Sequence, residues 1–162
     1  MIKRLCLHYC AFAFFFCLSL TAGCSGPYKS VRLLPADQFK EKSKNAVNSS
    51  MPSWETRQTL RLMSMDKDYR KDHRKVISEI EQMVKKEPSP ELRMALAELS
   101  LLEAQRYAKS DMQKAMERYL VAAQQSYDYL FLDVRSVSSS PLSPSFRFMA
   151  DIYNLAVAEL LE

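Results

Sequence analysis

The feature of this chain that most restricts its fold is the near absence of glycine. The only two glycines, Gly23 and Gly26, lie near the N-terminus, and residues 27–162 contain none. Tight hairpin turns, phosphate-binding loops and nucleophile elbows depend on glycine, because glycine adopts positive φ freely and lets the backbone approach a ligand closely. The same stretch is rich in Ala, Leu, Met, Glu, Gln, Lys and Arg, which favour helices. We therefore expect an all-α domain.

Apolar residues recur at helical spacing along this stretch, and helix-start signals divide it into segments. Ser53, Ser89 and Ser143 each precede such a segment as candidate N-caps, and Pro follows two of them at the first helical position. The pattern predicts an irregular bundle of about five helices, with a weaker candidate for a further one. The expected segments are 53–65, 72–86, 89–107, 110–131 and 143–162, and the weaker candidate is 36–49.

Two neighbouring segments also indicate which residues form the core. In the 89–107 helix, the expected core residues are Leu92, Leu96, Leu99 and Leu102. In the 110–131 helix, the expected inner face comprises Met112, Ala115, Met116, Tyr119, Ala122 and Ala123. The small and large positions of this helix pair resemble a tetratricopeptide (TPR) hairpin, although no second copy of that repeat is present.

The N-terminal residues have the layout of an export signal. Lys3 and Arg4 precede an almost unbroken apolar run over 5–20, and small residues then lead to Cys24. This stretch resembles the lipobox of bacterial lipoproteins, in which the cysteine is acylated and becomes the first residue after cleavage. We expect cleavage between Gly23 and Cys24. An uncleaved anchor and an ordinary secretory signal are the alternatives.

Cysteine usage agrees with lipid attachment. Three of the four cysteines lie within the expected signal, so that Cys24 would be the lone thiol of the mature chain. A lone cysteine makes no internal disulfide, whereas a thioether-linked diacylglycerol would give it a role. Each buried lipid CH₂ contributes about 0.8 kcal/mol, so several acyl chains would hold a small domain firmly on a bilayer.

The predicted organisation is a signal peptide over 1–23, an acylated Cys24 with a tether over 24–35, and a helical domain over 36–162. Without the signal the chain has 21 basic and 19 acidic side chains, a balance that does not suggest a nucleic-acid partner. We expect the protein at the cell envelope, held by its lipid. Ser25 favours the outer membrane, because enterobacterial lipoproteins retained at the inner membrane carry Asp at that position.

The sequence offers little for catalysis or metal binding. The expected mature chain has one histidine and one cysteine, which cannot form an ordinary His/Cys metal cluster. His73 lies among charged residues without a positioned partner, so we interpret it as a solvated helix-start residue and not a general base. No G-x-S-x-G motif occurs, and the serines over 136–140 are typical of a loop. We expect no catalytic, cofactor-binding or metal-binding residue.

Two clusters are candidate contact surfaces. The first is basic and would either meet anionic lipid headgroups or form a solvated face; it comprises Arg70, Lys71, Arg74 and Lys75. The second is apolar and would either belong to the core or line a groove for a partner peptide; it comprises Tyr127, Tyr129, Leu130 and Phe131.

The last helix keeps an apolar face to its end and lacks a C-terminal cap. An amphipathic helix needs a surface to pack against. Either the other helices of the domain supply it, or the face docks on a following domain or on a hydrolase domain supplied in trans. The possible interaction residues are Ile152, Tyr153, Val157, Leu160 and Leu161.

Two tracts, AAQQSYDYLF over 122–131 and FRFMADIYNLAVA over 146–158, carry a further resemblance. They resemble the N-terminal helical region of large bacterial lipoprotein-like α/β-hydrolases, and the resemblance covers roughly 28–162. The catalytic domain of that family has no counterpart here, so no catalytic residue is transferred. The resemblance implies a non-catalytic, lipid-anchored helical domain, either a naturally short relative or a truncated reading frame. A helical adaptor for a protein or peptide partner, and a fragment that works with a separately encoded hydrolase domain, are the alternatives.

Overall fold

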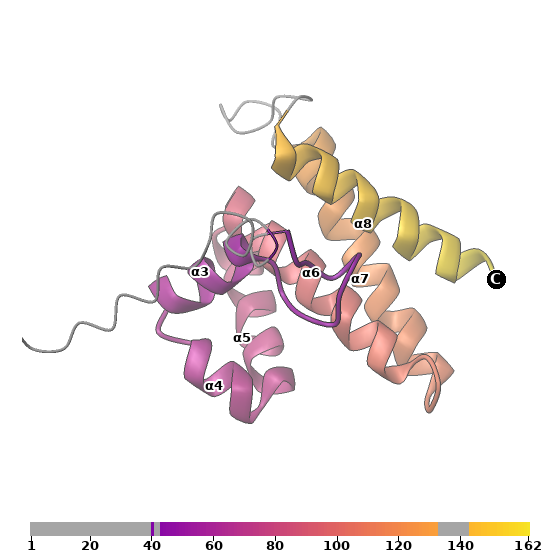
Figure 1. Cartoon of the computed structure of the whole chain (residues 1–162), viewed down its shortest axis with the longest axis horizontal. Coiled ribbons are helices and arrows are strands. Elements are labelled where there is room, and N and C mark those ends of the chain that lie inside the picture. Colours follow the sequence, from indigo (N-terminus) through magenta and orange to yellow (C-terminus); the bar gives the residue numbers. More distant parts are fainter. Residues whose placement is uncertain (1–39, 41–42, 133–142) are drawn as a thin grey trace, which may run out of the picture. The chain divides into compact units, whose positions relative to one another are not determined.

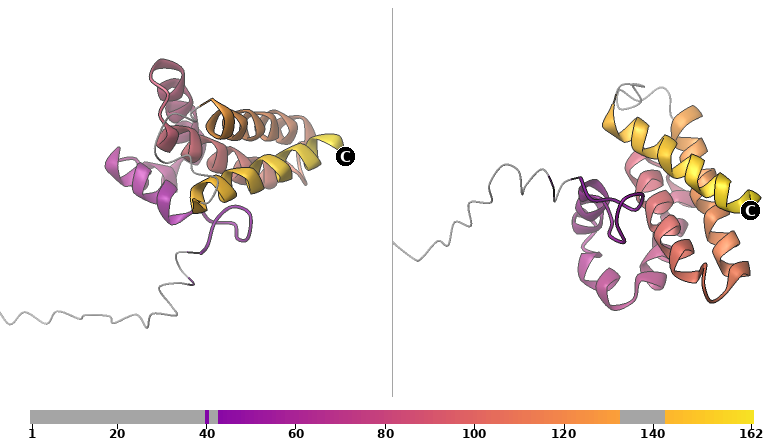
Figure 2. Two further views of the ribbon diagram at one scale, coloured as in Figure 1. Left: turned by 90° about the horizontal axis from the view of Figure 1, so that it is seen from above. Right: turned by 45° about the vertical axis from the view of Figure 1, so that its right-hand side comes forward.

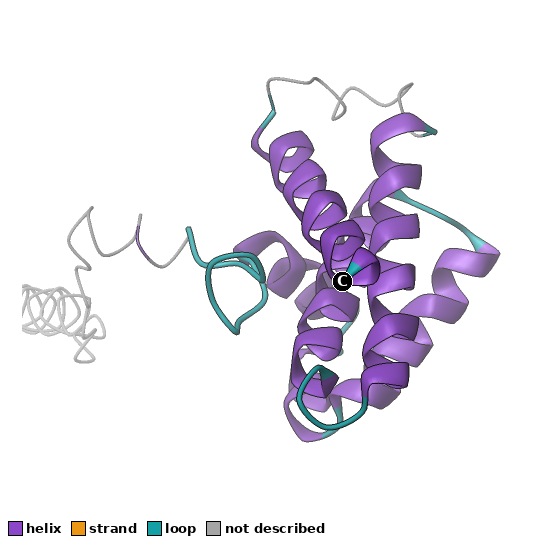
Figure 3. Cartoon of the chain, turned by 90° about the vertical axis from the view of Figure 1, so that its right-hand side faces the viewer, coloured by secondary structure: helices purple, strands orange, loops and turns teal. Residues whose placement is uncertain are grey.

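The structure is a computed structural model that describes residue 40 and residues 43–132 and 143–162. These residues form six α-helices and contain no strand (Figures 1 and 3), which confirms the all-α prediction. The helices are α3 (Trp54–Leu62), α4 (Asp66–Lys71), α5 (His73–Lys86), α6 (Pro90–Tyr107), α7 (Met112–Phe131) and α8 (Pro144–Leu161). The predicted signal peptide, the tether and the serines over 136–140 lie outside the described residues.

Side-chain caps fix the starts of five helices. In each, an oxygen of the capping side chain accepts the backbone N–H three residues later, at 3.1–3.2 Å. The caps are Ser53, Asp72, Ser89, Asp111 and Ser143. The predicted starts at the three serines are confirmed, and Asp72 is the cap of α5 and not its first residue.

α3 ends three residues earlier than the sequence predicts. Ser64 adopts φ 58° and donates its N–H to Arg61 O at 2.9 Å, and Met65 donates its N–H to Leu60 O at 2.7 Å. This pair of hydrogen bonds is a Schellman motif, in which the left-handed residue after the helix is usually glycine. Here serine occupies that position, so the sequence lacks the glycine that would have indicated the end of the helix.

The helix expected over 36–49 is present at residue 40 but does not continue through residues 43–49. Residues 43–50 form turns, and Asn45 explains why. Its side-chain oxygen accepts the N–H groups of Val47 at 2.9 Å and Asn48 at 3.2 Å, and its backbone oxygen accepts that of Ser49 at 2.8 Å, so that a single local turn forms here. The N–H of Ala46 is taken by Glu98, 52 residues further along the chain.

α6 is the central helix of the bundle. It contacts α3, α5, α7 and α8, and every residue from 94 to 104 is buried. Figure 1 shows α7 lying along it. The predicted core residues Leu96 and Leu99 are confirmed as buried. Burial also extends to Leu101 and to the rest of the helix circumference, as expected of a helix that is enclosed by others.

α6 and α7 are joined by a short turn and form an antiparallel hairpin, and α8 packs along α7 (Figure 2). The inner face of α7 is formed by Ala115, Tyr119, Ala122 and Ala123, as predicted. Met112 and Met116 were wrongly placed on it, because both side chains are exposed. They lie beside the row of buried alanines. The small alanine side chains allow α6 to pack closely against α7, and the two methionines then lie outside this contact.

Candidate functional site

Glu98 has no exposed surface, although it lies in the middle of the central helix. Its Oε1 accepts the N–H groups of Ala46 at 3.0 Å and Ser53 at 2.7 Å, and its Oε2 accepts the Ser53 hydroxyl at 2.7 Å. Burial raises the pKa of Glu98, while the hydrogen bonds from Ser53 and Ala46 act to lower it. All of these donors precede α3, so this carboxyl group holds the segment over 46–53 against α6. Its role is structural.

A second buried acid, Glu103, connects three helices. Arg118 of α7 lies with its Nε 2.9 Å from Glu103 Oε2, and its Nη1 lies 3.7 Å from Glu81 Oε2 on α5. Arg74 approaches the other oxygen of Glu103 at 4.0 Å. Neither buried acid was predicted as a functional or core residue. The sequence feature that could have identified them is an acidic residue inside an almost wholly apolar run, since such a residue is usually a buried charge with a partner.

His73 begins α5 as expected and is half-buried. Its ring meets the ring of Tyr69 edge-on, with centroids 6.4 Å apart. Burial lowers the pKa of His73, and the nearby Arg106 guanidinium lowers it further. The described residues contain no group of three or more His, Cys, Asp or Glu side chains that could hold a metal ion.

The basic cluster over 70–75 divides into separate environments. Arg74 lies over the ring of Tyr107 at 5.4 Å besides approaching Glu103, and Lys75 pairs with Glu79 at 3.8 Å. Arg70 instead lines a pocket with two arginines of α3. The cluster is exposed as expected, but it is not one uniform surface.

α7 carries a row of exposed apolar side chains that the sequence analysis only partly recognised. Five of them are between 45 and 62% exposed and recur at spacings of four and seven residues, which places them on one side of the helix. This α7 stripe consists of Met112, Met116, Leu120, Tyr127 and Phe131. Large apolar side chains that are exposed on one side of a helix in this way are typical of a contact site.

The predicted interaction face of α8 separates into buried and exposed parts. Ile152 is fully buried together with Met149 and Ala156, so this side of α8 faces the core. Tyr153, Val157 and Leu160 are half-buried, and Leu161 is 83% exposed. The rest of the domain therefore covers part of the apolar face and leaves one flank accessible.

The accessible flank of α8 meets the α7 stripe. The rings of Tyr127 and Tyr153 lie with their centroids 6.2 Å apart, and the Phe131 ring lies 4.7 Å from that of Tyr127. Val157 and Leu160 follow Tyr153 by four and seven residues, so they lie on the same side of α8. We call the α7 stripe together with Tyr153, Val157 and Leu160 the α7–α8 apolar surface.

The aromatic cluster of the sequence analysis contributes to both the core and this surface. Tyr129 and Leu130 are buried, whereas Tyr127 and Phe131 are exposed. The outer border of the α7 stripe is polar but carries little charge, since it contains Gln113, Glu117 and Gln124. An apolar centre with a polar rim is the usual composition of a protein interface.

Comparison with known proteins adds no relative: no family model, no curated protein and no solved structure matches the chain. Among the helices in the described part of the chain, none combines the length and the apolar character needed to cross a membrane.

Proposed function

We propose that the chain is a lipid-anchored, non-catalytic helical domain of a bacterial cell-envelope lipoprotein, and that it holds a protein partner at the membrane. The α7–α8 apolar surface is the observation that carries this proposal. Burying it would stabilise a complex by about 25 cal/mol for each Å² of apolar area removed from water. The lipid on Cys24 would keep the complex at the membrane, with the outer membrane favoured by Ser25.

The occupant that best fits the surface is an amphipathic helix of the partner. The stripe runs from Met112 to Phe131, about 28 Å along α7 at a rise of about 1.5 Å per residue. α8 lies beside it, so the apolar face of a partner helix could contact exposed side chains of both helices. The α6–α7 hairpin is in keeping with a TPR-like adaptor, whose helices present such surfaces to partner segments.

One observation favours a hydrolase domain as this partner. The tracts that resemble hydrolase lipoproteins, 122–131 and 146–158, contain Tyr127, Phe131, Tyr153 and Val157. These four residues belong to the α7–α8 apolar surface, so in hydrolase lipoproteins a corresponding surface would support the catalytic domain. This chain would then bind such a domain supplied in trans.

The partner surface is tested by photo-crosslinking in cells that express the full chain. A photoreactive amino acid at position 120 or 157 is expected to give one discrete adduct. The same group at position 62 is the matched control, because Leu62 is an exposed leucine on α3, outside the surface. Tyr127→Asp should remove the adduct. An adduct with a second copy of the chain, or equal adducts at 62 and 120, would contradict the proposed partner.

The lipid anchor is tested separately. Cys24→Ser should abolish metabolic labelling with palmitate and release the protein from the membrane fraction, because the thiol that forms the thioether is gone. Ser25→Ala, at the neighbouring position, should leave labelling unchanged. Labelling that persists in Cys24→Ser would show that the lipid is elsewhere or that the signal acts as an uncleaved anchor.

A further inference from the structure

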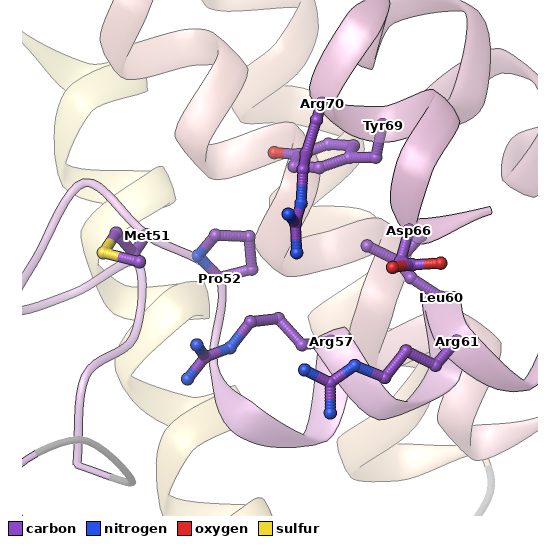
Figure 4. A pocket seen from close by; sticks show the side chains of 8 residues that line it. All are labelled: Met51, Pro52, Arg57, Leu60, Arg61, Asp66, Tyr69 and Arg70. Carbon is purple, nitrogen blue, oxygen red and sulfur yellow. The ribbon is translucent and has the colours of Figure 1, made fainter. Parts of the chain in front are cut away.

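A pocket of about 230 Å³ lies between α3, α4 and the segment that precedes α3. Met51, Pro52 and Leu60 form its apolar part. Figure 4 shows the remaining lining side chains, which are polar or charged and come from both helices. A pocket of this size is smaller than most cofactor sites and suits a ligand the size of a lipid headgroup.

Three arginines border this one pocket. Arg57 and Arg61 are four residues apart, which places them on one side of α3. Arg70 comes from α4 and points toward the two α3 arginines in Figure 4. Arginine presents a planar fork of N–H donors that matches the oxygens of a phosphate group.

The charge of the lining is not balanced. Asp66 is the one acidic residue among the lining residues, against the guanidinium groups of Arg61 and Arg70. Two other arginines of the described structure lie close to acids: Arg93 lies 2.7 Å from Asp128, and Arg118 lies 2.9 Å from Glu103. Arg61 and Arg70 make no ion pair with any acid among the described residues. Like charges that converge in this way repel one another, and a bound anion would relieve that repulsion.

We propose that this pocket binds a phosphate group, with Arg61 and Arg70 as its ligands. The apolar part formed by Met51, Pro52 and Leu60 favours a phosphate ester over the bare ion, because an ester carries carbon atoms that these side chains can contact. The ester is either the headgroup of an anionic phospholipid or a small soluble phosphate. The pocket is on α3 and α4, so this inference does not depend on the partner surface of α7 and α8.

The test uses the full chain in a non-ionic detergent at low salt, where charge interactions are least screened. It is titrated with inorganic phosphate, with glycerol 3-phosphate and with monomeric dihexanoyl phosphatidylglycerol, and sodium acetate serves as the ionic-strength control. The readouts are the NMR signals of the arginine Nε–H groups and the fluorescence of Trp54, the single tryptophan of the chain. Saturable changes with at least one phosphate ester and none with acetate are expected.

Arg61→Gln and Arg70→Gln should each weaken binding by about tenfold, since a charge-assisted hydrogen bond is lost. Arg147→Gln is the matched control, because Arg147 is an exposed arginine on α8, and it should not change the affinity. Equal responses to glycerol 3-phosphate and the lipid would indicate a soluble ligand, and a response to the lipid alone would indicate a headgroup. The proposal is overturned if no probe saturates, or if Arg147→Gln weakens binding as much as the pocket variants.

Discussion

Ser53 binds Glu98 through two hydrogen bonds of 2.7 Å, one from its backbone N–H and one from its hydroxyl group. The same hydroxyl oxygen accepts the N–H of Thr56 and caps α3. A single serine thus completes the start of one helix and satisfies a buried carboxyl group in the middle of another. The position of α3 on the bundle depends on this link, because Glu98 has no exposed surface and cannot form hydrogen bonds with bulk water in its place.

Replacement of Glu98 should therefore destabilise the domain in proportion to the donors left without an acceptor. Glu98→Ala leaves the N–H groups of Ala46 and Ser53 without an acceptor, and each unsatisfied buried group costs about 1–3 kcal/mol. We expect a loss of about 3–5 kcal/mol, and a smaller loss for Glu98→Gln, which keeps one acceptor oxygen. Urea unfolding measures both variants, and faster amide exchange at Ala46 should accompany the first. An unchanged unfolding midpoint in Glu98→Ala would contradict the structural role.

The raised pKa of Glu98 also predicts how stability changes with pH. Between its ordinary value of 4.5 and its higher folded value, the folded state binds more protons at this site than the unfolded state. This group alone therefore makes the domain less stable as pH rises through that window. Relative to Glu98→Gln, the wild type should gain stability as pH is lowered from neutral toward 4.5. Urea midpoints of the two proteins at several pH values give the comparison, and parallel curves would be the contrary result.

The helix starts could be predicted because their causes are local. A cap lies three residues from the N–H that it accepts, and Ser89 and Ser143 are also followed by proline, so both parts of the signal are adjacent in the sequence. The long central run around Leu96 and Leu99 was likewise recognisable as core, because its apolar residues recur at helical spacing.

The features that could not be predicted depend on contacts between residues that are distant in the sequence. The residues next to Ala46 in the sequence do not indicate that its N–H is hydrogen-bonded to Glu98. That contact helps to keep residues 43–49 from becoming helical. The exposure of Met112 and Met116 was missed because they border the buried alanine row of α7, and only the position of α6 decides which row faces inward. The candidate site was therefore predicted only in part. The sequence identified its α8 residues, whereas most of the α7 stripe was recognised only in the structure.

Arg118 should be a strong determinant of stability, because its removal leaves Glu103 buried without its closest cation. Arg118→Met is expected to cost about 3–5 kcal/mol, the usual effect of breaking a buried ion pair. Adding Glu103→Gln should recover part of the loss, which a double-mutant cycle in urea unfolding would measure. Lys85→Met is the matched control. It removes an exposed pair with Glu81 at 3.2 Å, and its effect should stay below about 1 kcal/mol. Similar losses in the two single variants would show that Glu103 is not the cause.

Ser64→Gly should stabilise the domain, although most substitutions to glycine do the opposite. Ser64 is held at φ 58° by the Schellman motif at the end of α3, and a left-handed conformation is unfavourable for serine but not for glycine. We expect a gain of about 1 kcal/mol in the free energy of unfolding, measured by urea denaturation. Ser78→Gly provides a control with the opposite sign, because Ser78 is an exposed residue inside α5, where glycine is less favourable than serine by about 0.5 kcal/mol. If both variants lost stability, Ser64 would not carry the backbone strain inferred for it.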